Sequence, residues 1–138
     1  MYKVGVTGNF TAVHALVGDV PVEEKEPHPH NYYLEWTLWI TNLDERGFSL
    51  DISLLETIRD ELFSSMSGKV LNDLAWFREK TTSLEYLCTY MFESLLKSVR
   101  KSMEVADVQR ISKMETKVWE NENAWAAVND CFENGRSR

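Results

Sequence analysis

The feature that most constrains the fold is the alternation of side chains over residues 32–41. Every second position is large and apolar, and the positions between them mix polar with aromatic residues: Tyr32, Leu34, Trp36, Leu38 and Ile40 against Tyr33, Glu35, Thr37, Trp39 and Thr41. A period of two is that of a β-strand with one face on a core. The aromatic residues on the second face are compatible with burial against another subunit.

Strand-like and helical patterns follow one another around this run. We predict further strands over residues 2–16, 105–119 and 124–129, and a loop over residues 17–29. We predict one helix after the N-cap Asp51, with a capping box formed by Ser53 and Glu56, and a second helix opened by Thr82 and Glu85 at the same spacing. The order ββααββ lacks the alternation of a parallel sheet. It therefore predicts an α+β fold, with a four-stranded antiparallel sheet and two helices on one face.

Length and charge limit the class of protein. The 138 residues predict a single domain over residues 1–138, in which we expect residues 132–138 to form a frayed tail. The 22 acidic and 15 basic residues give a net charge of −7, which argues against nucleic acid as a partner. No apolar run approaches membrane-spanning length. Cys88 and Cys131 lack a paired spacing, which suits a cytoplasmic protein, and Cys88 falls on an apolar helical face typical of a core.

The three histidines of the chain are the candidate metal ligands. His28 and His30 are two positions apart, so in extended chain both imidazoles leave the same side of the backbone. His14, in another extended run, supplies a third. Three neutral imidazoles form a catalytic type of zinc site with one open position. The alternative is that His28 and His30 are ordinary loop residues and that His14 is a core histidine.

Six short motifs point to one family because they follow one another along the chain in the same order as in that family. They are Phe-Thr-Ala-Val-His-Ala-Leu at 10–16, His-Pro-His-Asn-Tyr at 28–32, Gly-Phe-Ser-Leu-Asp-Ile at 47–52, Leu-Asn at 71–72, Thr-Ser-Leu-Glu-Tyr-Leu at 82–87 and Met-Glu-Thr at 114–116. Together they resemble the 6-pyruvoyltetrahydropterin synthase and 6-carboxytetrahydropterin synthase family, whose members have the T-fold, or tunnelling fold.

The resemblance implies roles for particular residues. His14, His28 and His30 match the family's zinc ligands. Glu115 matches a glutamate that accepts hydrogen bonds from the amino and ring N–H groups of a pterin, a task that suits the two oxygens of a carboxylate, and Thr116 could assist it. The alternative for Glu115 is a strand carboxylate on a solvated face. Family members also assemble into barrels with pterin sites between subunits, so a trimer-based homo-oligomer, commonly a hexamer, is expected.

The departures from the family pattern fall on the proton-transfer residues. Glu24 stands where the family has its catalytic cysteine, and Ser67 and Gly68 stand in place of an Asp-His pair. Without those groups the standard synthase reaction has no evident acid or base. A proline, Pro29, also replaces the central glycine between the paired histidines.

Two main hypotheses follow from these departures. In the first, zinc holds the side-chain hydroxyls of dihydroneopterin or its triphosphate, and Glu24 acts as the base for an aldolase-like cleavage. In this hypothesis the neighbouring Glu23 and Glu26 are further candidates for the base, although solvated loop charges are the simpler interpretation of both. In the second, the chain is a catalytically degenerate protein that binds zinc and a pterin on the same scaffold. A third interpretation, the least favoured, is a structural sheet protein without metal.

Overall fold

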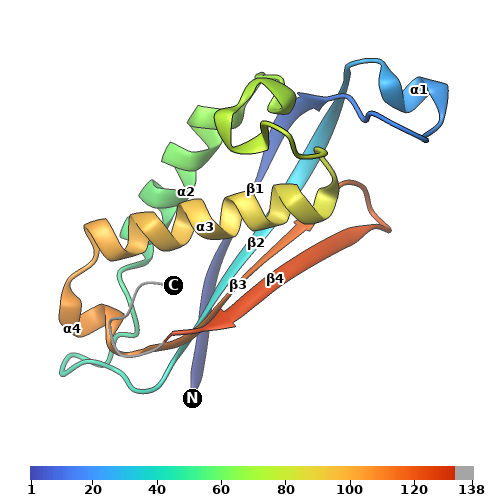
Figure 1. The fold of residues 1–138 in the computed structure, drawn as a ribbon. Coiled ribbons are helices and arrows are strands. Elements are labelled where there is room, and N and C mark those ends of the chain that lie inside the picture. The colour runs from blue at the N-terminus through green and yellow to red at the C-terminus, as the bar shows by residue number, and fades with distance from the viewer. Residues whose placement is uncertain (133–138) are drawn as a thin grey trace.

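The computed structural model describes residues 1–132 and consists of one sheet covered by helices on one face. The strands β1 (Tyr2–His14), β2 (His28–Ile40), β3 (Ile111–Trp119) and β4 (Trp125–Cys131) pair antiparallel in the order β1-β2-β3-β4. Two long helices, α2 (Ile52–Met66) and α3 (Leu84–Ser102), lie across the same side of the sheet (Figure 1). The α+β prediction with ββααββ order is confirmed.

The core lies between the helices and the sheet, as the alternation predicts. Trp36 and Leu38 of β2 and Met114 of β3 are fully buried, as are Met91 and Leu95 of α3. Burying apolar side chains of this size removes a large nonpolar area from water, which is the main term that favours folding. The apolar face of each strand therefore fixes which side of the sheet the helices cover.

Short elements connect the main ones. A one-turn helix α1 (Val22–Lys25) follows β1, two 3₁₀ turns η1 (Leu71–Asp73) and η2 (Ala75–Phe77) join α2 to α3, and α4 (Val105–Val108) follows α3. The first half of the strand predicted over residues 105–119 is therefore wrong. Its apolar residues Val105, Val108 and Ile111 are three apart, a spacing that fits a helical turn better than a strand.

The start of β2 also differs from the prediction. The strand begins at His28, because β1 and β2 pair along their whole length and His14 lies opposite His28. The predicted loop is therefore shorter, and His28 and His30 belong to a strand. Pro29 is accommodated at the end of β2, beyond the part that pairs with β3.

The two helix starts differ in how well the sequence predicted them. Asp51 caps α2 as predicted, accepting hydrogen bonds from the N–H of Ser53 and Leu54 at 2.9 and 3.4 Å, rather than a box of Ser53 with Glu56. The cap of α3 is Ser83, which accepts from the N–H of Tyr86 at 3.2 Å. The cap predicted at Thr82 is therefore one residue too early.

The chain end lies partly outside the described residues. Of the tail predicted over residues 132–138, residues 133–138 are not described. Phe132 is attached to the sheet, since its N–H donates to the carbonyl of Ser112 at 2.9 Å. The frayed tail therefore does not include Phe132.

Candidate metal centre

The three histidines converge at one end of the β1–β2 hairpin. His14 and His28 are cross-strand partners, and His30 follows two positions later on the same face of β2. One ligand atom from each ring lies within 4.8 Å of those of the other two, and the ring centroids are 4.5–4.9 Å apart. The strand register thus brings together the side chains that the sequence singled out.

Hydrogen bonds to two of these rings orient their free nitrogens toward one another. Nδ1 of His14 lies 2.9 Å from the carbonyl oxygen of Thr82, and Nδ1 of His28 lies 2.8 Å from that of Glu26. A carbonyl only accepts, so each Nδ1 carries the hydrogen and each Nε2 presents a lone pair. Both Nε2 atoms are buried, and neither has a hydrogen-bond partner among residues 1–132.

The electrostatics of the centre favour a neutral imidazole at His14. Burial lowers the pKa of His14 and outweighs the opposing effect of the Thr82 carbonyl, and the neighbouring His28 and His30 lower this pKa further. A neutral imidazole is the form that binds a metal ion. The buried Nε2 atoms of His14 and His28, together with a ligand atom of His30 nearby, form a group that could hold a metal ion.

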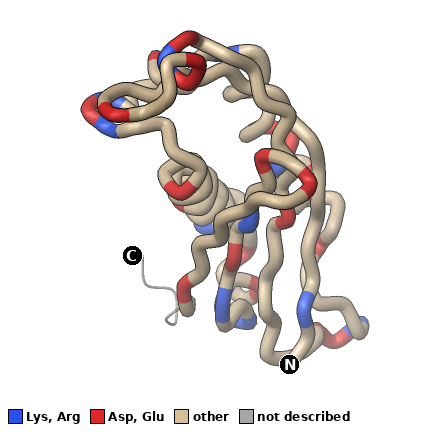
Figure 2. Tube along the Cα trace, turned by 90° about the vertical axis from the view of Figure 1, so that its right-hand side faces the viewer, with Lys and Arg blue, Asp and Glu red and all other residues tan. Residues whose placement is uncertain are grey.

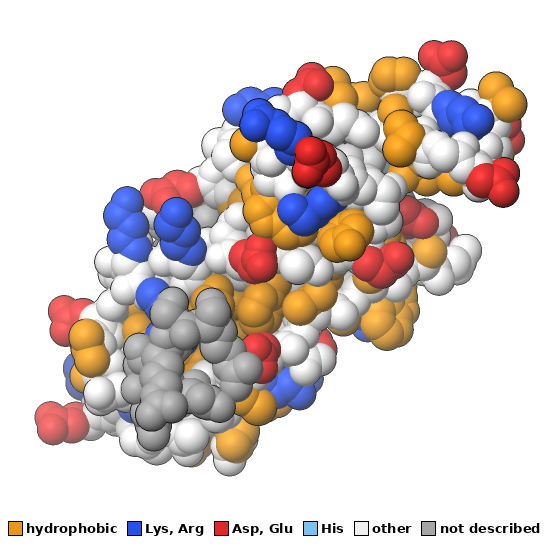
Figure 3. Space-filling model, viewed as in Figure 1, with side chains coloured by type: hydrophobic (Ala, Val, Ile, Leu, Met, Phe, Trp, Pro, Cys, Tyr) orange, Lys and Arg blue, Asp and Glu red, His pale blue; other side chains and the backbone are white. Residues whose placement is uncertain are grey.

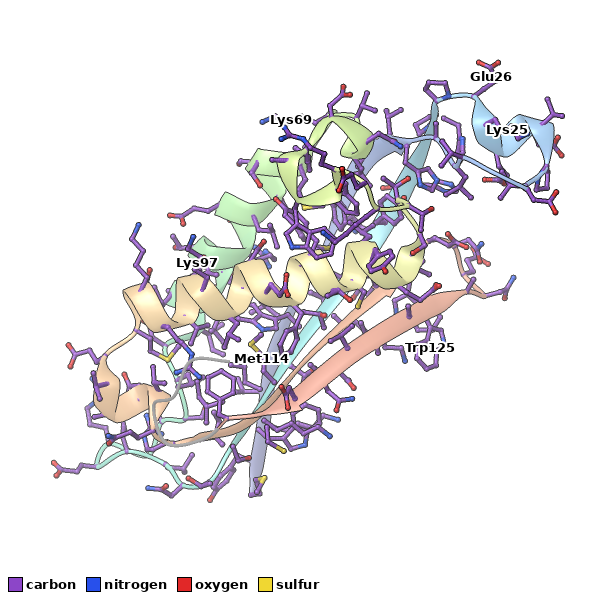
Figure 4. The ribbon with its side chains drawn as sticks, viewed as in Figure 1. Lys25, Glu26, Lys69, Lys97, Met114 and Trp125 are labelled. Carbon is purple, nitrogen blue, oxygen red and sulfur yellow. The ribbon has the colours of Figure 1, made fainter. Side chains whose placement is uncertain are left out.

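Glu24, the residue singled out as a candidate base, lies next to His28. Helix α1 carries it beyond the strand ends, on the projection at the upper right of Figure 3. Its Oε2 is 3.4 Å from Nε2 of His28, without the geometry of a hydrogen bond. A carboxylate oxygen facing a nitrogen lone pair is unfavourable unless a proton or a metal ion lies between them. Glu26 follows the end of α1, and its side chain, labelled in Figure 4, points away from the rest of the molecule, while its carbonyl contacts His28.

Two residues that were not predicted to contribute to this centre hold the segment after His14. The side-chain amide of Asn72 accepts from the N–H of Ala15 at 3.0 Å and donates to its carbonyl at 2.9 Å. Thr82 donates its hydroxyl to the same carbonyl at 3.3 Å, while its own carbonyl orients His14. Asn72 belongs to the Leu-Asn motif, so the sequence carried a signal for it, whereas Thr82 was assigned to a helix cap.

Glu115 does not reach the histidines within one chain. It lies opposite Thr37, seven positions along β2 from His30, which is about 23 Å at the rise of a strand. Its side chain also projects from the sheet face opposite to the helices, where Asn129 donates to it at 3.3 Å. A site that used the three histidines together with Glu115 would therefore need a second copy of the chain.

Thr116, which was expected to assist Glu115, has its side chain in the core. It is fully buried, and its hydroxyl donates to the carbonyl of Cys88 at 3.2 Å. The thiol of Cys88 is buried beside it, as predicted, and this burial raises the pKa of the thiol. The side chain of Thr116 therefore attaches α3 to β3.

Comparison with known proteins places the fold in a family. The family model of 6-pyruvoyl tetrahydropterin synthase matches residues 3–131. The chain belongs to this family. A search of curated proteins gives no significant match. Within the described part of the chain, no helix combines the length and the apolar character needed to cross a membrane.

Solved structures of the synthase family share the fold at low sequence identity. The synthase of Plasmodium vivax, in a variant in which a catalytic glutamate is replaced by cysteine, has a TM-score of 0.77 at 15% identity, covering 95% of this chain and 98% of its own. The synthase of Plasmodium falciparum has a TM-score of 0.76 at 15% identity, with the same coverage. That of Caenorhabditis elegans has a TM-score of 0.73 at 18% identity, covering 94% of this chain and 95% of its own. The T-fold prediction is thereby confirmed.

Proposed function

We propose that this chain is a zinc-dependent enzyme that acts on the side chain of a dihydropterin, dihydroneopterin or its triphosphate, by an aldolase-like cleavage. The observation that carries the proposal is the convergence of three imidazoles with the carboxylate of Glu24, whose Oε2 lies 3.4 Å from Nε2 of His28. The buried Nε2 atoms of His14 and His28 have no partner among the residues described, so a bound cation would satisfy both.

Each group at the centre has a distinct chemical role in this proposal. Zinc, held by His14, His28 and His30, would lower the pKa of a substrate hydroxyl. Glu24 accepts the proton of the hydroxyl on the second side-chain carbon. The bond between the first and second carbons then breaks, the second carbon becomes an aldehyde, and the electron pair passes into the ring system. Reprotonation of the first carbon leaves 6-hydroxymethyl-dihydropterin, so the reaction is that of a lyase.

The structural relatives support a glutamate in this role. A glutamate is catalytic in the synthase of Plasmodium vivax, which shares the fold of this chain. In this chain Glu24 replaces the catalytic cysteine that other family members carry, and helix α1 holds it beside the histidines. A carboxylate can perform the base chemistry that a thiolate performs elsewhere.

Recognition of the pterin ring would involve a second copy of the chain. Glu115 presents two acceptor oxygens to the ring edge in this proposal, and its separation from His30 along β2 means that it would serve the histidines of a neighbouring copy. We therefore propose a homo-oligomer, trimer-based and most simply a hexamer, with sites shared between copies.

The decisive experiment is Glu24→Gln in purified, zinc-loaded protein supplied with dihydroneopterin or its triphosphate. We expect turnover to fall by about 10²-fold or more, with zinc content unchanged, because the variant removes the base and keeps the three imidazoles. Glu26→Gln is the matched control, because it keeps the backbone carbonyl that contacts His28 and its side chain points away from the molecule (Figure 4). Normal turnover in Glu24→Gln would refute the assignment of the base.

A second candidate function is favoured by what stands in place of the family's Asp-His pair. Ser67 is the C-cap of α2, and Gly68 follows it with a positive φ of 72°, so neither offers an acid or base. A catalytically degenerate protein would bind zinc and a pterin but form no product from either substrate. Metal analysis of the wild type against His28→Ala/His30→Ala tests both functions, because a wild-type protein without zinc would exclude them.

A further inference from the structure

The segment between β1 and β2 carries Glu24 but has no core of its own. None of residues 17–27 is buried, and the apolar side chains of Val17 and Val22 are 71% and 74% exposed. The one-turn helix α1 within the segment has no side-chain cap. Figure 2, which turns the right-hand side of Figure 1 toward the viewer, shows several acidic positions at the top of the molecule, where the segment lies. A segment that buries so little apolar surface opens at a low cost in free energy.

Three polar contacts within the described chain hold this segment in place, and two of them fall on His28. Nδ1 of His28 donates to the carbonyl of Glu26 at 2.8 Å, and its Nε2 lies 3.4 Å from Oε2 of Glu24. In the third contact the N–H of Leu16 donates to the carbonyl of Glu24 at 2.7 Å. The other hydrogen bonds that residues 17–27 make with described residues are internal to the segment. His28 is therefore the main polar attachment of the segment to the sheet.

The state of His28 decides whether these contacts attract the segment. A carboxylate that faces the lone pair of an imidazole is repelled, whereas a divalent cation bound to that nitrogen would attract it. A bound cation would also fix the ring, so that Nδ1–H stays directed at the carbonyl of Glu26. The segment carries four acidic residues and one basic residue, so its overall charge adds to this attraction. A ligand that interacts differently with two conformations shifts the population toward the one it favours.

The segment has a hinge near the point where it leaves β1. Gly18 has a positive φ of 91°, and no atom lies within 4 Å of the position that a Cβ would take. Glycine adopts this conformation readily, and the open space lets the backbone rotate without a clash. The other end of the segment is fixed at His28, where the pairing of β2 with β1 begins. The residues between these two points can therefore move as a unit.

We propose that residues 17–27 form a strap that closes on the histidines when a metal ion binds there. In the loaded protein His28 holds the strap through Glu24 and Glu26, so the carboxylate of Glu24 stays beside the centre. In the unloaded protein the strap opens, which gives a metal ion a path to His14, whose side chain is buried. The base and the metal site are thereby assembled together. The inference rests on the metal centre of the proposed function and not on the reaction proposed there.

Hydrogen exchange, followed by mass spectrometry, tests the strap in protein with excess zinc and in protein with a chelator. The measurement is made at about pH 8, where imidazoles are generally neutral. The amide hydrogens of Leu16 and Glu24 report closure, because they are bonded to the carbonyls of Glu24 and Pro21. We expect zinc to slow their exchange about tenfold or more, and to change exchange in the loop of residues 41–51, at the far end of β2, less than about twofold.

Limited proteolysis gives a second readout of the same motion. Lys25 is the one basic residue of the strap, so trypsin cleaves the strap after it. We expect zinc to slow this cleavage about tenfold, since a protease needs the open segment. Cleavage after Arg46, whose side chain is exposed in the loop at the far end of β2, is the internal control and should not change.

Two adjacent carboxylates separate closure of the strap from a general effect of zinc. With zinc in excess, Glu24→Gln should lose most of the slowing, because it removes the charge that faces His28. Glu23→Gln is the matched control, since Glu23 precedes Glu24 on α1 and is exposed. This control should keep the slowing of the wild type in both exchange and cleavage.

The zinc content of each sample keeps this inference distinct from the proposed function. Exchange and cleavage that are equal with and without zinc, in protein that has bound zinc, would overturn the strap while the proposed function stands. The same slowing in Glu24→Gln as in the wild type, or an equal slowing in residues 41–51, would also overturn it. A wild-type protein that binds no zinc would overturn the proposed function itself, and the strap with it.

Discussion

Two hydrogen bonds from the side chain of Asn72 to the backbone of Ala15 link the stability of the fold to the metal centre, and the effect of removing them can be calculated. Asn72→Ala deletes two hydrogen bonds to the backbone of Ala15, the residue that follows His14. Each partly buried bond contributes about 1 kcal/mol, and the N–H of Ala15 is left without its acceptor, so the expected loss is about 2–3 kcal/mol. Urea unfolding in the presence of a chelator measures this loss in the metal-free protein.

The same substitution tests whether Asn72 positions a metal ligand. Residues that orient metal ligands typically change affinity by about 10–100-fold, so zinc binding, measured by competition with a chromophoric chelator, should weaken by that factor. Asn129→Ala is the control, because Asn129 is exposed and makes one long bond, and it should change stability by about 0.5 kcal/mol or less. If Asn72→Ala unfolds at the same urea concentration as the wild type and binds zinc equally tightly, Asn72 does not position His14.

Two further predictions concern the scaffold. Native protein should react with a thiol reagent at Cys131 alone, because Cys131 is exposed whereas Cys88 is buried with a raised thiol pKa, and Cys88 should react only on unfolding; fast native modification of Cys88, located by mass spectrometry, would contradict this. Asp51→Ala should lower the free energy of unfolding by about 1 kcal/mol, because it removes the cap of α2, and Asp51→Asn should restore most of that loss in the same urea assay.

The alternating pattern was sufficient to predict the sheet because it records burial directly. Trp36 and Leu38 are fully buried in β2, and the run that contains them defines which face the helices cover. The start of β2 could not be predicted in the same way. His28 and Pro29 lack strand-like character of their own, and they are extended because β1 pairs with them. Cross-strand pairing is long-range, so a local pattern does not contain it.

The cap of α3 shows a different limit. Thr82 and Glu85 have the spacing of a capping box, but the hydroxyl of Thr82 is directed to Ala15 and Ser83 takes the cap. Adjacent Thr and Ser residues are nearly equivalent as caps, so the choice between them depends on which one a tertiary contact engages. Here the hydroxyl of Thr82 is engaged by Ala15, while the carbonyl of the same residue orients His14, and the helix begins one residue later.

The metal ligands and the ring-binding residues differ in how far a sequence can locate them. His14, His28 and His30 lie on one hairpin, so a strand register is enough to bring them together. Glu115 was also found by motif matching, yet it lies on the other face of the sheet and far along β2 from the histidines. A sequence motif identifies a residue but does not say whether that residue acts on the site of its own chain or on the site of another copy. Substitutions at His30 and Glu115 therefore test recognition across copies: if a site takes His30 from one copy and Glu115 from another, mixed oligomers of the two variants should recover part of the pterin binding that each variant alone has lost.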